Sequence, residues 1–272
     1  SGQEQFLDST AKAIADALSQ FPYEMLSDTE GTPIYAHQLQ NPPLIDGYVD
    51  DWDVPNNALV DIRGADGPIS YLLGQVRQHY FLYLNIRDKS IIYAGSNTAD
   101  SIFDKAYLTS IGATGEKTII EFAAEAPGKI VARRIEGNDY VDETRIDGYW
   151  RDAATGYRIE ARIPRNLLGN HVGLSVFNTT DSRRGGTTST NFEGALPGPI
   201  IGVSPVLQSV AAGYVQPGWR LIITDKDGWR LAQAEPVDTT ATRSADVAGQ
   251  SGWLPLIYKL VLEDGEETVL AT

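Results

Sequence analysis

The sequence contains no cysteine and only three histidines among 272 residues. The absence of cysteine excludes disulfides and thiolate metal sites, and it suits a protein that works outside the cytoplasm. His37, His79 and His171 lie far apart, and none belongs to a zinc-protease motif. The sequence also lacks the Gly-x-Ser-x-Gly motif that presents a nucleophilic serine. We therefore expect no catalytic residue in this chain.

Positive charge and long apolar runs are also scarce. The 22 Lys and Arg residues are outnumbered by 36 Asp and Glu residues, which gives a formal net charge of -14. Proteins that bind nucleic acids usually present a basic face, so we expect no nucleic-acid partner. The apolar stretch at 253–262 is interrupted by Pro255 and Lys259, and it is far shorter than the roughly 20 residues of a membrane helix. A hydrophobic content of 42% nevertheless predicts a packed core.

The N-terminal segment has the pattern of an amphipathic helix. Apolar residues recur at helical spacing over residues 3–21, and they are Leu7, Ala11, Ile14, Leu18 and Phe21. Pro22 ends this pattern, and Gly31 and Pro33 follow in a linker. Because the chain begins at Ser1 without Met and stops at Thr272, we expect it to be part of a longer protein.

The central part of the sequence has the two-residue period of β-strands. Tyr157, Ile159, Ala161 and Ile163 alternate with charged residues, which predicts a half-buried strand. In residues 80–86 both alternating sets are apolar, which predicts a strand covered on both sides. Further predicted strands are 69–77, 117–123, 129–135 and 171–178. Many short strands with turns between them predict a mainly β fold, an antiparallel β-sandwich.

The last third of the chain differs in pattern. Residues 181–198 are rich in Gly, Thr and Ser, which predicts a mobile loop or hinge, and 237–252 predicts another exposed connection. Gly218-Trp219-Arg220-Leu221 recurs as Gly228-Trp229-Arg230-Leu231, with an Asp-Gly turn between the two. This repeat predicts a β-hairpin.

An acidic cluster, Asp46, Asp50, Asp51 and Asp53, lies within the strand-entry stretch that ends at Trp52. Closely spaced carboxylates suit calcium, which takes six to eight oxygen ligands. The cluster lacks the Asp-x-Asp-x-Asp-Gly loop and its distant bidentate Glu, so the alternative is a set of turn and surface residues. Calcium is the single cofactor that the sequence suggests; otherwise we expect none.

Four aromatic residues are candidates for binding a ligand. Tyr48, Trp52, Tyr149 and Trp150 could offer flat faces on which a sugar ring stacks. The alternative for each Trp is that it fills the core.

Three segments carry a resemblance to a known family. The stretch Pro43 to Trp52, the strand Tyr80 to Asp88, and the strand Gly156 to Pro164 with Leu167-Leu168-Gly169 occur in the order and spacing of the family 9 carbohydrate-binding module. The resemblance covers about half of the chain, roughly residues 42–181, and implies a β-sandwich.

A second resemblance involves the tail. Ser204-Pro205, the two Gly-Trp-Arg-Leu repeats and residues 253–262 look like the membrane-proximal part of bacterial sensor histidine kinases. The whole arrangement resembles the sensor region of the kinase from proteobacterial dedicated sortase systems. It implies an N-terminal membrane-proximal helix and linker at 1–36, a carbohydrate-binding-module-like sandwich at 37–200 and a small membrane-proximal α+β segment at 201–272. The phosphoacceptor histidine and the ATP-binding lobe are missing, so this fragment is expected to be no enzyme.

The resemblance implies a periplasmic module of a protein anchored in the inner membrane. Its ligand would be a saccharide, an envelope component or a partner protein, and the N-terminal helix would pack against the tail or form a homodimer. The alternative is a secreted, non-catalytic carbohydrate-binding module. A third hypothesis is a stand-alone glycoside hydrolase, for which no motif directs a carboxylate pair.

Overall fold

The computed structural model describes residues 31–55, 57–62, 69–95, 102–181, 185–192, 196–215, 220–224, 230–234, 257–263 and 266–271, together with Ser9, Lys12, Ala13 and Asp16. The chain divides into two compact units, residues 29–201 and residues 1–28 with 202–272. Compactness alone does not show which parts fold independently. The three-part division expected from the sequence therefore stays a prediction.

The larger unit is built almost entirely from β-strands. These are β1 (Ile34–Gln38), β2 (Val60–Asp61), β3 (Ile69–Val76), β4 (His79–Arg87), β5 (Lys105–Ile111), β6 (Lys117–Ala123), β7 (Gly128–Ile130), β8 (Arg133–Glu136), β9 (Asp139–Asp142), β10 (Asp147–Ala153), β11 (Gly156–Pro164), β12 (His171–Asp181), β13 (Gly185–Thr190) and β14 (Gly198–Gly202). Their order is β7-β10-β11-β4-β3-β1-β14-β12-β5-β6-β8-β9, with β13 paired to β12 and β2 paired to β3. β1 runs parallel to β3, so this sheet is mixed.

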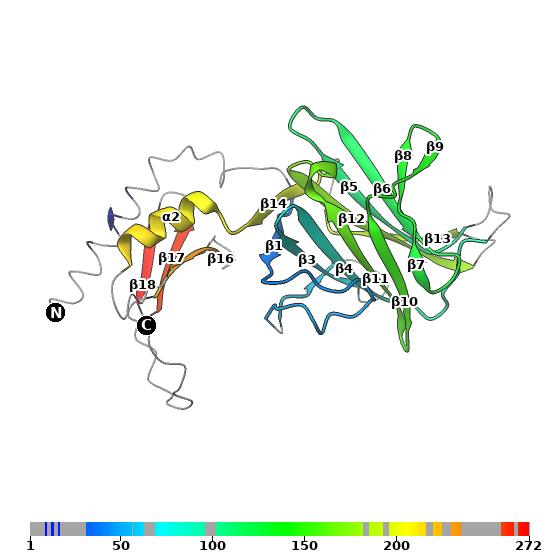
Figure 1. The fold of residues 1–272 in the computed structure, drawn as a ribbon, viewed down its shortest axis with the longest axis horizontal. Coiled ribbons are helices and arrows are strands. Elements are labelled where there is room, and N and C mark those ends of the chain that lie inside the picture. Colours follow the sequence, from blue (N-terminus) through cyan, green and yellow to red (C-terminus); the bar gives the residue numbers. More distant parts are fainter. Residues whose placement is uncertain are drawn as a thin grey trace. The chain divides into compact units, whose positions relative to one another are not determined.

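The sheet curls so that its two halves enclose one core (Figure 1). Leu82 and Leu84 of β4 lie in this core with Leu108 of β5 and Phe122 of β6. Each large apolar side chain buried in this way contributes about 1.5–3 kcal/mol. The mainly β, sandwich-type fold expected from the sequence is confirmed.

A second apolar cluster covers the outer face of β3 and β4. Phe81 and Tyr83 of β4 pack there against Trp52, Leu39 and Leu72. β4 is therefore buried on both faces, as its unbroken apolar pattern predicted.

The chain enters and leaves the larger unit along neighbouring strands, because β1 and β14 are adjacent in the sheet. Gly31, before β1, has φ +103°, and a Cβ there would lie 2.8 Å from the Cα of Gly198 at the start of β14. A Cβ on Gly198 would in turn lie 1.7 Å from the carbonyl oxygen of Thr32. Two glycines thus allow the entering and leaving backbones to touch.

Two predictions for this unit are wrong. The single strand expected at 129–135 is divided into β7, which pairs with β10, and β8, which pairs with β6. Between them Ala132 is fully buried, and its carbonyl oxygen accepts a hydrogen bond from the Glu143 amide at 2.7 Å. The hinge expected at 181–198 contains β13, which pairs with β12 over residues 185–190. Its threonines suit a strand, and β12 supplies the hydrogen bonds that its composition alone does not reveal.

The smaller unit has an α+β arrangement, as expected. This unit contains helix α2 (Pro205–Tyr214) and a four-stranded sheet. The strands are β15 (Arg220–Thr224), β16 (Arg230–Ala234), β17 (Ile257–Glu263) and β18 (Glu266–Ala271), and their order in the sheet is β16-β15-β17-β18. β15 and β16 are antiparallel, which confirms the predicted hairpin, and β15 pairs in parallel with β17. Ser204 caps α2 by accepting the Leu207 amide at 3.3 Å.

Little of the N-terminal segment is described, but Ser9, Lys12, Ala13 and Asp16 are helical. The Tyr214 hydroxyl of α2 donates a hydrogen bond to the carbonyl oxygen of Ala13 at 3.4 Å. The predicted apolar stripe, Leu7, Ala11, Ile14, Leu18 and Phe21, lies outside the described residues, as does 237–252. Within the described parts, no helix has the length and apolarity to cross a bilayer.

Candidate functional site

A buried carboxylate organises the outer face of the larger unit. Glu160 on β11 is completely buried, and its Oε2 accepts hydrogen bonds from the backbone amides of Asp46 at 2.9 Å and Gly47 at 2.7 Å. Its Oε1 accepts a hydrogen bond from Nε1 of Trp52 at 2.9 Å. We call these three contacts the Glu160 anchor. They hold residues 46–52 against the sheet.

Burial raises the pKa of Glu160 to about 7, against an ordinary value of 4.5. The loss of hydration is the largest contribution, because it disfavours the charged carboxylate. The N–H groups of the anchor favour the charged form and limit the rise. Glu160 is thus a buried acid whose charge changes near neutral pH.

The turn at Asp46 and Gly47 requires glycine. Gly47 has φ +83°, and a Cβ there would lie 2.6 Å from Cβ of Arg151 on β10. Asp46 shapes the same turn, since its Oδ1 accepts a hydrogen bond from the Tyr48 amide at 3.0 Å. The turn therefore lies directly against Arg151.

The two tryptophans among the predicted ligand residues are buried. Trp52 is 5% exposed and packs edge to face with Phe81, at a ring-centroid distance of 6.4 Å. Trp150 is 1% exposed and stacks on Tyr157 at 4.1 Å with an interplanar angle of 9°. In this structure neither indole offers an open face, and core packing, the alternative interpretation, describes both. Sugar binding by these two residues remains an untested prediction.

The two tyrosines, by contrast, lie around one arginine. Tyr48 is 42% exposed and Tyr149 is half-buried. The Arg151 guanidinium lies 3.9 Å from the ring centroid of Tyr48 and 5.5 Å from that of Tyr149, and its Nη1 donates to the Tyr48 hydroxyl at 3.1 Å. Nε of Arg151 also donates to the Asp46 carbonyl oxygen at 2.6 Å. We call Tyr48, Tyr149, Arg151 and the neighbouring Arg158 the Tyr–Arg patch.

The acidic cluster is divided between turn and surface positions. Asp46 binds the Tyr48 amide, and Asp51 accepts a hydrogen bond from the Leu44 amide at 2.7 Å. Asp50 and Asp53 are exposed. Among all described residues, no three Asp, Glu, His or Cys side chains gather closely enough to hold a metal ion. The structure thus does not bring the four aspartates together as ligands for calcium.

Other buried acids of the larger unit are occupied by structural contacts. Asp104 is 1% exposed and accepts the backbone amides of Ile92 and Thr179, both at 2.7 Å. Burial raises its pKa, and the nearby charge of Asp88 adds to the rise. Glu121, also buried, pairs with Arg133 at 2.6 Å. Each of these carboxylates stabilises the fold locally.

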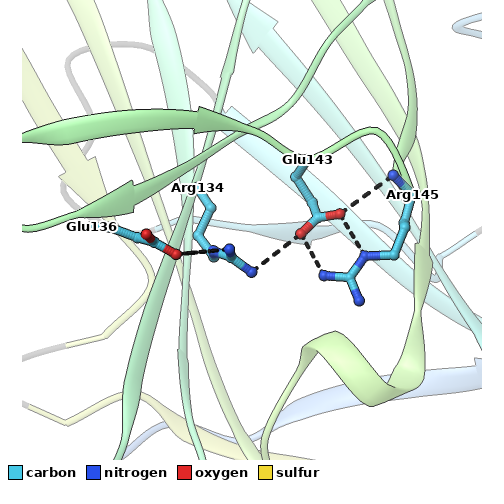
Figure 2. A network of polar contacts seen from close by, with 4 residues as sticks. All are labelled: Arg134, Glu136, Glu143 and Arg145. Carbon is cyan, nitrogen blue, oxygen red and sulfur yellow. Dashed lines mark hydrogen bonds and ion pairs between the residues drawn. The ribbon is translucent and has the colours of Figure 1, made fainter.

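Glu143 belongs to an ionic network with Arg145, Arg134 and Glu136 (Figure 2). Arg145 donates two side-chain hydrogen bonds to it, each at 2.7 Å, and Arg134 a third at 3.4 Å. The hydrogen bonds from Arg145 are the main reason that the pKa of Glu143 is lowered. In this network every arginine has an acidic partner, whereas the arginines of the Tyr–Arg patch have none among the described residues.

Sequence reasoning identified Tyr48 and Tyr149 but missed Glu160, Arg151 and Arg158. The alternation at 157–163 placed Glu160 on the polar side of its strand, where an acid appears unremarkable. A usable signal was present in the cross-strand register, which places Arg151 opposite Arg158. That register becomes visible only once β10 and β11 are paired.

Comparison with known proteins yields similarity in structure alone. No family model matches the sequence, and no curated protein does. A family 9 carbohydrate-binding module from Caldicellulosiruptor kristjanssonii in complex with cellotriose is similar, with a TM-score of 0.43, 18% identity, and coverage of 64% of this chain and 96% of that chain. The glucose complex of such a module from the same organism gives a TM-score of 0.40, 18% identity, and coverage of 64% and 98%. At this level of similarity, function must be argued from the chain's own residues.

Proposed function

We propose that the larger unit is a non-catalytic module that binds a saccharide on the Tyr–Arg patch. The observation that carries this proposal is the grouping of an exposed Tyr48 ring, Tyr149 and Arg151 on one face. Aromatic rings offer rigid apolar area to the C–H face of a sugar, and guanidinium groups donate hydrogen bonds to its oxygens. The Glu160 anchor holds the Tyr48 loop in place beforehand, which reduces the entropy lost on binding.

Tyr48→Ala is expected to weaken saccharide binding by about 10-fold, since it removes the most exposed ring of the patch. Affinity would be measured by titration calorimetry with a panel of oligosaccharides. Tyr140→Ala is the matched control. Tyr140 lies on β9, is 52% exposed and, like Tyr48, has an arginine over its ring: Arg133, at 5.1 Å from the ring centroid. Equal affinities for both variants and the unmodified protein would place the binding site elsewhere.

We further propose that this module is the extracytoplasmic, periplasmic part of a membrane-anchored sensor histidine kinase. The division of the chain supports this idea, since residues 1–28 and 202–272 belong to one unit and the binding unit is inserted between them. A ligand could then act on both terminal segments, provided that it binds one of their arrangements more tightly than another. A homodimer through the N-terminal helix belongs to the same proposal.

The parent gene tests the sensor role. An apolar run of about 20 residues on each side, with a kinase beyond the second, is the expected result. A signal peptide upstream, with an enzyme domain or a stop codon downstream, would instead identify a secreted carbohydrate-binding module. The saccharide-binding proposal survives either outcome.

A further inference from the structure

Two arginines on the outer face are placed directly opposite each other. Arg151 of β10 and Arg158 of β11 are register partners in the antiparallel pair, and both are half-buried. Their guanidinium groups lie 3.9 Å and 5.9 Å from the ring centroid of Tyr48. Like charges directly opposite on neighbouring strands destabilise a sheet. The juxtaposition of the two positive charges therefore costs the unliganded protein stability.

Neither arginine has an acidic partner among the residues that the structure describes. Arg151 donates to a backbone carbonyl oxygen and to the hydroxyl of Tyr48, both uncharged. The side chain of Arg158 makes no hydrogen bond among the described residues, and its Nε is both buried and unpaired. The closest acid on the same strand face, Glu160, is fully occupied by the Glu160 anchor.

This absence contrasts with the rest of the unit, where acids are abundant. The whole chain has 36 acidic against 22 basic residues, so acidic partners for its arginines are plentiful. Arg133 pairs with Glu121, and Arg134 pairs with both Glu136 and Glu143. Arg145 also pairs with Glu143, and Arg162 pairs with Asp147. Arg77, Arg87 and Arg165 are exposed, so water can hydrate them. Arg151 and Arg158 are half-buried and face each other, and no acidic side chain of the described part of the chain pairs with either.

We propose that the Arg151–Arg158 pair binds an oxyanion, carboxylate or sulfate, carried by the saccharide. Guanidinium groups match planar and tetrahedral oxyanions with paired hydrogen bonds, and such charge-assisted bonds are about twice as strong as neutral ones. The sugar ring of the same residue lies against Tyr48. The inference rests on the proposed function and narrows its ligand class from saccharides in general to acidic saccharides.

The test compares three ligands on the full chain at low ionic strength. They are trigalacturonate, which carries carboxylates; a κ-carrageenan oligosaccharide, which carries sulfate; and neutral galactotriose. Tighter binding of one charged ligand than of galactotriose, by about 10-fold or more, is expected. Which of the two charged ligands binds more tightly identifies the oxyanion.

Variants then assign the effect to the pair. Arg158→Gln should lose about 10-fold in affinity for the charged ligand and little for the neutral one. Arg162→Gln is the control, since it removes the same charge from the same strand, four residues away, where Arg162 pairs with Asp147. An equal loss in both variants would show a general charge effect and overturn the proposal.

Failure of the inference is distinguishable from failure of the proposed function. If galactotriose binds as well as both charged ligands and Tyr48→Ala weakens all three, the saccharide site stands and the oxyanion site falls. If no ligand binds, both fall.

The melting temperature supplies an independent measurement. Without ligand, the melting temperature of Arg158→Gln should equal or exceed that of the unmodified protein, because the substitution relieves the repulsion between the arginines. A clear decrease would show that Arg158 is structural and would overturn the proposal.

Discussion

Glu160→Ala is expected to lower the free energy of unfolding by roughly 3–4 kcal/mol. The substitution leaves three buried N–H groups, those of Asp46, Gly47 and Trp52, without their acceptor. Each unsatisfied buried donor costs about 1–3 kcal/mol, and entry of water recovers part of that cost. Urea denaturation followed by tryptophan fluorescence measures the change.

Glu136→Ala is the control for this experiment. Glu136 also binds an arginine, Arg134 at 2.7 Å, but its side chain is 53% exposed. Ion pairs of this kind contribute about 0–1 kcal/mol. If the two alanine variants unfold at the same urea concentration, the Glu160 anchor does not stabilise the fold.

The pH dependence of stability gives a second test of the anchor. The pKa of Glu160 is raised by burial to about 7, above its ordinary value of 4.5, so the folded protein binds this proton more tightly than the unfolded chain. The resulting stabilisation is fully present below about pH 4.5 and is lost as the pH rises through 7. We therefore expect the free energy of unfolding of the unmodified protein, relative to that of Glu160→Gln, to fall by up to about 3 kcal/mol as the pH rises from about 4.5 to above 7. A difference that stays constant from pH 4 to pH 8 would contradict the raised pKa.

Trp150→Ala is expected to cost about 3–5 kcal/mol, the range for removing a large aromatic side chain from a core. Trp150 is 1% exposed, and its ring lies parallel to that of Tyr157. The substitution leaves a cavity in the main core beside Tyr157, and β10 and β11 cannot move into it without disturbing their ladder. Thermal unfolding followed by circular dichroism measures the effect.

Trp150→Phe separates packing from hydrogen bonding at the same position. Within the described residues Nε1 of Trp150 has no partner, so phenylalanine removes an unsatisfied group while keeping an aromatic ring beside Tyr157. We expect a cost below about 1.5 kcal/mol. A Phe variant as unstable as the Ala variant would show that the indole N–H is bonded in solution.

The sequence predicted which side chains of β4 and β11 enter the core, because alternate residues of a strand point to opposite faces and the apolar residues mark the core face. It did not predict what covers the other side. Glu160 and Arg158 occupy equivalent positions in the pattern, yet one is fully buried and the other half-buried. The difference arises from residues 46–52, which lie more than 100 positions earlier in the chain. No local pattern contains that information.

The hinge that was predicted at residues 181–198 was also wrong because a distant segment, β12, decides the structure there. Residues 185–190 are polar and small, and by themselves they bury too little apolar surface to order a segment. They form β13 because β12 offers them a ladder of backbone hydrogen bonds. The tyrosines of the candidate site were identifiable as aromatic residues near turns, whereas the pairing of Arg151 with Arg158 depends on the register of two strands.

The contact between Gly31 and Gly198 has a consequence for the history of the chain. Because the larger unit starts and finishes at adjoining backbones, it has the geometry of a cassette that can be spliced into a surface loop of a host protein without forcing the host's cut ends apart. The same geometry favours circular permutation: a bridge from residue 202, at the end of β14, back to residue 31, with a loop opened elsewhere, should preserve the sheet order.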